Sequence, residues 1–122
     1  MINSTTPPLT SIARVATSSP ARYARQLVSH MSHKITATWD AETEHGVLNF
    51  DREGMSLGTC ELSCGETTLI LTLHSDEEEI PILEEIIGSH LVRFGSKDSL
   101  VVSWVRSDGS NGTTQGPYTP GE

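Results

Sequence analysis

Five side chains in two short segments have the chemistry to bind a ligand. His30, His33 and Lys34 lie together in the segment HMSHK, and His90 and Arg93 lie in HLVRF. Imidazole can coordinate a transition metal and changes its charge near neutral pH, while Lys and Arg bring positive charge and hydrogen-bond donors. On a chain whose net charge is −8, these groups stand out as contacts for an anion. We take the five residues as the candidate ligand-binding set.

Each of these histidines also has a structural explanation. His30 and His33 fall where a helix is expected to end, and a charged imidazole there complements the helix dipole. His90 falls within an apolar stripe, where a buried histidine commonly bonds to a backbone carbonyl or a hydroxyl. For each of these histidines, the structural explanation and the ligand-binding explanation both stay open. The other two histidines, His45 and His74, fall at strand ends and are expected to face solvent.

Histidine nitrogens and the thiolate of Cys60 would suit zinc or another transition metal. The expected topology argues against such a site. If the middle strands form a simple meander, the two helices run antiparallel, and His30 and His33 lie at the end away from His90. Helices of about 12 and 18 residues are ~18 and ~27 Å long, so one ion could not bridge that gap. We expect no metal shared by these residues, and the sequence defines no cofactor.

The usual signatures of catalysis are missing from the sequence. It has no Gly-rich phosphate loop, no HExxH, no GxSxG and no EF-hand loop. The acidic run at residues 76–79 and the pair Glu84 and Glu85 are expected on the solvated face of a helix. Cys60 is expected to point inward from a strand, so no nucleophile is evident, and only His30 and His90 remain as candidate bases. Enzymatic activity stays uncertain, and no catalytic residue is assigned.

The sequence predicts a cytoplasmic location by default, and the two cysteines agree with it. Cys60 and Cys64 would lie ~13 Å apart along a strand, farther than the roughly 7 Å that a disulfide allows. No apolar run approaches the ~20 residues that span a bilayer. Residues 1–20 lack the pattern of a signal peptide. The acidic charge repels both nucleic acid and anionic lipid, so we expect neither as a partner.

Apolar periodicity predicts two helices and six strands. A stripe at helical spacing follows Ser19-Pro20, and a second follows Asp76. Pro81 is unfavourable inside a helix, so the second helix either bends there or begins later. Alternation at every second residue predicts strands near residues 10–17, 35–39, 46–50, 59–64, 68–73 and 100–106.

The resulting order, β-α-β-β-β-β-α-β, predicts a fold of the α+β class. We expect a two-layer sandwich in which two helices cover one face of an antiparallel-rich sheet, a variant of the ferredoxin-like fold. Composition divides the chain into a disordered arm (residues 1–8), a single domain (residues 9–106) and a disordered tail (residues 107–122).

Three segments together, RYARQLVSHMSHK, GTCELS and SHLVRFGSKDSLVVSW, resemble DUF2218, a bacterial family of small uncharacterised proteins. The resemblance extends from about Ile12 to Arg106. Its most specific parts are His30-x-x-His33-Lys34, Cys60 and His90-Leu91-x-Arg93-Phe94. The chain departs from the family pattern at Met31 and at residues 96–98. The family has no established activity, but the resemblance implies a setting, because such domains resemble those joined to or near siderophore-interacting flavin reductases.

Three hypotheses for the function follow. The first is an accessory binding module in siderophore and iron handling, whose partner is a ferric siderophore or a reductase. The alternative is a structural or self-associating domain that forms a homodimer through the polar sheet face or an edge strand. A second alternative is an enzyme that acts on a small substrate.

Overall fold

The computed structural model describes residues 8–52 and 55–117. The expected arm therefore lies outside the described residues, apart from Pro8, which begins the first strand. The described elements follow one another as β1 (Pro8–Ala16), α1 (Pro20–Met31), β2 (Thr36–Asp40), β3 (His45–Arg52), β4 (Met55–Cys64), β5 (Thr68–Asp76), α2 (Ile80–Phe94), the 3-10 turn η1 (Ser96–Asp98), β6 (Val102–Arg106) and β7 (Asn111–Gln115).

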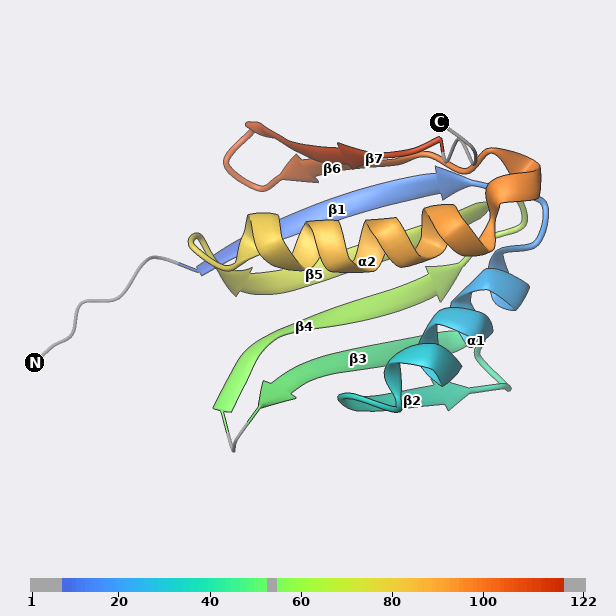
Figure 1. Cartoon of the computed structure of the whole chain (residues 1–122), viewed down its shortest axis with the longest axis horizontal. Helices are drawn as coiled ribbons and strands as arrows, with labels where there is room; N and C mark the ends of the chain where they lie inside the picture. Colours follow the sequence, from blue (N-terminus) through green and yellow to red (C-terminus); the bar gives the residue numbers. More distant parts are fainter. Residues whose placement is uncertain (1–7, 53–54, 118–122) are drawn as a thin grey trace, which may run out of the picture.

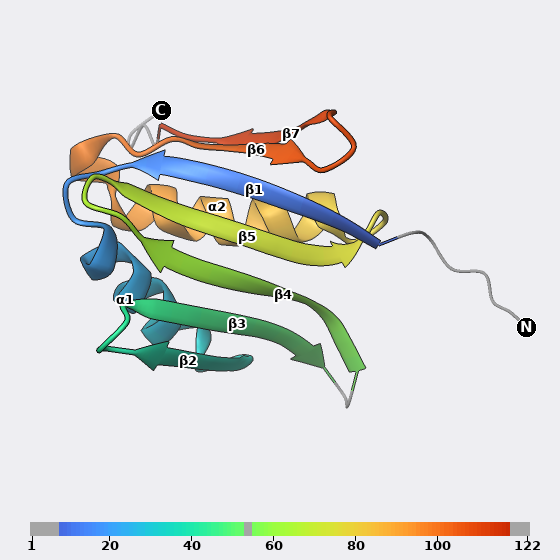
Figure 2. The ribbon, with the colours of Figure 1, turned by 180° about the vertical axis from the view of Figure 1, so that it is seen from behind.

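The strands form one sheet in the order β2-β3-β4-β5-β1-β6-β7, and every neighbouring pair is antiparallel. Both helices lie on the same face of this sheet (Figure 1), and the view from behind shows the other face uncovered (Figure 2). The predicted two-layer α+β sandwich is thus confirmed, as is the meander from β2 to β5. The core is the layer between the helices and the sheet.

Alternation along the strands fills this core from one side. On β1 the buried residues are Ser11, Ala13 and Val15, and on β5 they are Leu69, Leu71 and Leu73. From the other side, helix α1 buries a stripe of residues at helical spacing: Tyr23, Ala24, Leu27, Val28 and Met31. Burial of these apolar faces against one another is the main force that holds the two layers together.

Helix α2 begins later than Asp76, which settles the question that Pro81 raised. The helix starts at Ile80, so Pro81 lies in its first turn, where the missing N–H has no helical partner to lose. The carboxylate of Asp76 instead accepts a hydrogen bond from the backbone N–H of Glu79, at 3.0 Å.

The prediction of a disordered tail is wrong for residues 111–115, which form β7 at the edge of the sheet. The polar composition of this segment supplies specific partners. The indole Nε1 of Trp104 donates to the side-chain oxygen of Gln115 at 2.8 Å, and the backbone N–H of Thr113 donates to Glu84 at 3.0 Å. The folded domain therefore extends beyond residue 106.

The expectation that Glu84 is solvated is also wrong, because its side chain is completely buried. Its carboxylate accepts hydrogen bonds from Ser11 Oγ (2.6 Å), from Arg106 Nε and Nη2 (3.2 and 3.0 Å), and from the N–H and hydroxyl of Thr113 (3.0 and 2.9 Å). Burial raises the pKa of this carboxyl, but the donated hydrogen bonds outweigh it and hold the pKa below its usual value. The charge is buried because β7 covers this side of α2.

Two glycines permit the close approach of β7 to α2. A Cβ at Gly88 would lie 1.8 Å from the side-chain oxygen of Gln115, and a Cβ at Gly112 would lie 2.7 Å from both the Glu84 carboxylate and Cβ of Trp104. At Gly112 a Cβ would also meet the backbone oxygen of Trp104, at 3.0 Å, so a larger residue there would displace the strand and disturb the partners of Glu84. At Gly88 a larger residue would displace the Gln115 side chain from its hydrogen bond with Trp104.

We predict that Glu84→Gln lowers the free energy of unfolding by about 3 kcal/mol at pH 7, because the new amide presents donors to Arg106 and leaves its charge uncompensated. The folded-state pKa of Glu84 is depressed, so its contribution is complete above the ordinary glutamate pKa of about 4.3 and is lost as the pH falls below it. Urea unfolding at neutral pH and at about pH 3 should show the difference between wild type and variant shrinking in acid.

The matched control is Glu78→Gln, which removes an exposed carboxylate just before the same helix and should change stability by less than about 0.5 kcal/mol. Equal effects of the two substitutions would contradict the structural role of Glu84.

Candidate functional site

The structure brings His30 and His90 into contact, with their ring centroids 4.7 Å apart and their planes tilted by 47°. The prediction that these residues lie at opposite ends of the helix layer is therefore wrong. The meander is as expected, but α1 runs obliquely to α2 instead of alongside it (Figure 1). The Tyr23 hydroxyl also donates a hydrogen bond to the Asp98 carboxylate, which ties α1 to the turn that follows α2.

Phe94 completes a cluster of three rings. The centroid of its ring lies 5.5 Å from that of His30, in an edge-on arrangement, and 6.2 Å from that of His90, with the ring planes tilted. These rings, together with Ser89 and Arg93, line a hollow of about 500 Å³, which we call the aromatic hollow. It combines π surfaces, a guanidinium and two imidazoles at one place.

One ring of the cluster has a defined proton arrangement. Nδ1 of His90 lies 2.7 Å from the carbonyl oxygen of Ile86. A carbonyl oxygen only accepts, so Nδ1 carries a hydrogen and the neutral ring keeps its lone pair on Nε2. The predicted bond to a backbone carbonyl is thus present, but His90 is half-buried and lines the hollows instead of lying in the core. The same bond fixes the orientation of the ring.

His30 is held in its neutral form more strongly than an ordinary histidine. His30 is exposed, but the side chains packed beside its imidazole remove part of its hydration and lower its pKa, and the nearby His90, Lys34 and His33 lower that pKa further because a second positive charge is unfavourable among them. A bound anion would reverse the effect of these neighbours and favour the protonated ring.

A second hollow of about 520 Å³ adjoins the first and shares His90 with it. We call it the apolar hollow, because most of the side chains in its wall are hydrophobic. Ile82 is 55% exposed beside it. The wall consists of Met31, Lys34, Ile35, Phe50, Asp51, Leu57, Glu79, Ile82, Leu83, Ile86 and His90.

Four of the five candidate residues thus line two adjoining hollows: His30, Lys34, His90 and Arg93. His33 is exposed in the turn after α1 and lines neither of them. Sequence reasoning missed Ser89 and Phe94. The signal for Phe94 was its position four residues after His90, which places both on one face of a helix.

Within the described residues, no group of three or more His, Cys, Asp and Glu side chains could hold a metal ion. Cys60 is completely buried, and burial raises the pKa of its thiol far above the usual range. Both cysteines are free, as their spacing predicts. None of the described helices is long and apolar enough to cross a membrane.

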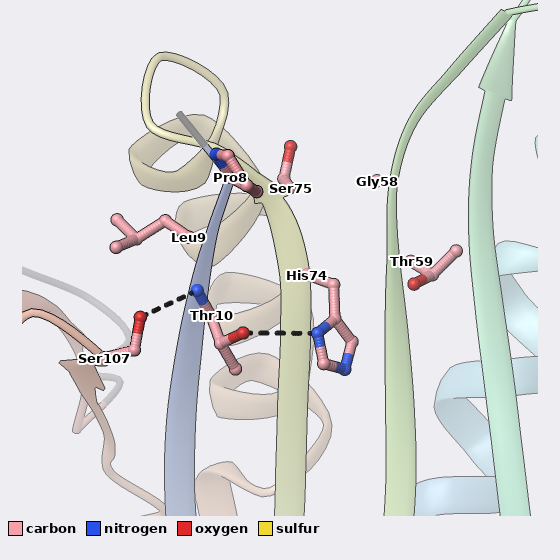
Figure 3. Close-up of a pocket in the computed structure, with 8 residues that line it drawn as sticks. All are labelled: Pro8, Leu9, Thr10, Gly58, Thr59, His74, Ser75 and Ser107. Carbon is pink, nitrogen blue, oxygen red and sulfur yellow. Dashed lines mark hydrogen bonds between the residues drawn. The ribbon is translucent and has the colours of Figure 1, made fainter. Parts of the chain in front are cut away.

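A third hollow lies on the uncovered face of the sheet, near the start of β1 (Figure 3). There Nδ1 of His74 lies 3.3 Å from the Thr10 hydroxyl, and the Thr10 N–H donates to Ser107 Oγ at 3.1 Å. Nε2 of His74 is 3.9 Å from the Glu61 carboxylate. These contacts join exposed side chains, and as expected His74 faces solvent, so this hollow is the weaker candidate.

The fold and the paired hollows define a small two-layer α+β domain with a ligand-sized groove between its helices. A family model described as "Uncharacterized protein conserved in bacteria (DUF2218)" matches residues 12–105, and the chain belongs to this family. The NMR structure of PA4090 from Pseudomonas aeruginosa is similar, with 28% sequence identity and a TM-score of 0.62, over 79% of this chain and 94% of that one. A comparison with curated proteins finds no match.

The buried position of Cys60 makes a direct prediction about thiol reactivity. In the native protein a thiol reagent should modify only Cys64, and slowly, because burial and the Glu44 charge raise its pKa as well. The variant Cys64→Ser should show no modification until denaturant is added. Fast labelling of native Cys64→Ser would show that Cys60 is accessible and would reopen the case for a thiol nucleophile.

Proposed function

We propose that the chain is an accessory binding module that acts in the cytoplasm and holds a small anionic ligand in the groove between α1 and α2. A ferric siderophore is the ligand that we propose, with an associated reductase as the partner that takes it further. The observation that carries this proposal is the convergence of His30, His90 and Arg93 around one hollow, with Lys34 beside them.

The chemistry of the aromatic hollow supports an anionic ligand. Arg93 provides a permanent charge with several donors, and the His30 imidazole can gain a charge when an anion approaches. The π faces of His30, His90 and Phe94 suit a flat aromatic group such as the ring of a catecholate. On a chain of net charge −8, a locally cationic hollow also distinguishes this site from the rest of the surface.

Binding fits the site better than catalysis does. The side chains of the aromatic hollow include an imidazole with a lone pair, but the only hydroxyl among them, on Ser89, lies 3.2 Å from the Glu85 carboxylate and also donates to the Glu85 carbonyl. An acyl- or group-transfer site needs a nucleophile within reach of a base, and Ser89 is turned toward its own helix.

Self-association is a second candidate function, favoured by one observation. Val105 on β6 is 52% exposed and lies directly across from the half-buried Ile12 on β1, and alternation points both side chains away from the helices. Adjacent apolar side chains on an uncovered sheet face can form part of a surface that meets a partner. A homodimer through this face would leave the groove between the helices open, and light scattering that shows a strict monomer at high concentration would exclude it.

To test the proposed function, we would titrate the labelled protein with a gallium-loaded catecholate siderophore and follow the amide NMR signals. Gallium is the diamagnetic substitute for ferric iron. We expect saturable shifts that cluster on residues 30–34 and 89–94. The variant Arg93→Gln should weaken binding about tenfold, because it removes a charged hydrogen bond from an exposed position without disturbing the core.

Arg25→Gln is the matched control, since Arg25 is exposed on α1 and lines none of the hollows described above. A well-dispersed spectrum that does not change with the siderophore would contradict the proposed function.

The affinity for an anion should increase as the pH falls from about 7.5 to about 5.5. The pKa of His30 is lowered in the free protein, and a bound anion raises it, so binding takes up a proton. The variant His30→Gln should lose most of this pH dependence. An affinity that is independent of pH in the wild type would show that His30 does not contact the anion.

A further inference from the structure

We propose that the ligand is amphipathic, with an anionic head in the aromatic hollow and an unbranched apolar chain along α2 in the apolar hollow. This inference rests on the proposed function, because it uses the same groove, and it specifies the class of ligand. The two hollows share one lining residue, His90, so a single ligand could occupy both.

The apolar hollow has the properties of a site for a hydrocarbon chain. Its volume of about 520 Å³ lies within the roughly 300–1,000 Å³ typical of small-molecule sites, which are mostly apolar with a few polar groups. Ile82 is 55% exposed and Ile86 is half-buried, so both side chains would gain by being covered.

The two hollows meet at His90 on one face of α2. Ile82, Ile86 and His90 are four residues apart and therefore lie above one another on the helix surface. At 1.5 Å per residue, the eight residues from Ile82 to His90 correspond to about 12 Å, the reach of a medium-length acyl chain. The facing wall is formed by Met31 and Ile35 at the end of α1 and by Phe50 and Leu57 on β3 and β4.

Charge gives the groove a direction. His30 and Arg93 lie at the His90 end, and Lys34 is close enough to His30 to affect its pKa. Glu79 lies at the other end, just before α2 begins, and would repel an anionic head. Asp51, the other carboxylate in the wall of the apolar hollow, is turned to Thr36, whose N–H and hydroxyl both donate to it. At the His90 end the Glu85 carboxylate contacts Ser89, and it also accepts a hydrogen bond from Gln115 Nε2 at 3.3 Å. A carboxylate head therefore belongs beside His90, with its chain directed toward Ile82.

The test compares straight-chain carboxylates from butanoate to decanoate, each below the concentration at which it forms micelles, with amide NMR as the readout. Each methylene buried in the apolar hollow should tighten binding roughly three- to fourfold until the hollow is filled. Decanol has the same chain without the charge and should bind at least tenfold more weakly than decanoate. The shifts should cluster on residues 30–35 and 82–94.

Two variants separate the ends of the ligand. Ile82→Asn changes an exposed side chain and should reduce the gain per methylene, while butanoate binds as before. Arg93→Gln should weaken all the carboxylates by the same factor. Val101→Asn is the control for Ile82→Asn, because Val101 is also an exposed apolar residue, at 41%, and lines none of the hollows described above.

The outcomes distinguish this inference from the proposed function. If the gallium siderophore binds in the groove but decanoate binds no more tightly than butanoate, the amphipathic class is wrong and the proposed function stands. Shifts from decanoate that map to the uncovered sheet face would also overturn the inference. If no anion binds between the helices, the proposed function fails and this inference fails with it.

Discussion

The buried carboxylate of Glu84 determines how α2 lies on the sheet. It accepts hydrogen bonds from Ser11 on β1, from Arg106 on β6 and from Thr113 on β7, so a single side chain links the helix to three strands. An unpaired buried carboxylate would be very costly, which leaves few rotations of the helix that satisfy it. The same rotation determines where the opposite side of the helix points, so Ile82, Ile86 and His90 face the groove toward α1.

The edge strand β7 has a structural role that its composition conceals. It contributes Thr113 and Gln115, covers the buried side of α2 and depends on Gly88 and Gly112 for its close approach. The groove toward α1 lies on an adjoining side of the same helix, because Ser89 and Arg93 line the aromatic hollow and also a hollow that Thr114 and Gln115 border.

The sequence predicts the layers and most of the elements, because apolar alternation and helical stripes depend on local periodicity. It also picks out His30, Lys34, His90 and Arg93 by their distinctive chemistry, and these four line the paired hollows. The features that the sequence does not predict share one cause: each depends on contacts between segments that are distant in the chain. Glu84 has the appearance of a surface residue until β7 is placed over it, and β7 itself has no apolar alternation. The meeting of His30 and His90 depends on the oblique path of α1, which no pattern within the helix reports.

The groove exists only if α1 and α2 converge where His30 contacts His90. The most direct measurement is a ¹H–¹H NOE experiment on the free protein, with the imidazole protons of all five histidines assigned. The rings lie 4.7 Å apart, so we predict NOE cross-peaks between the ring protons of His30 and those of His90, together with cross-peaks from both to Phe94. Well-resolved spectra in which His30 and His90 show no common neighbour would contradict the account.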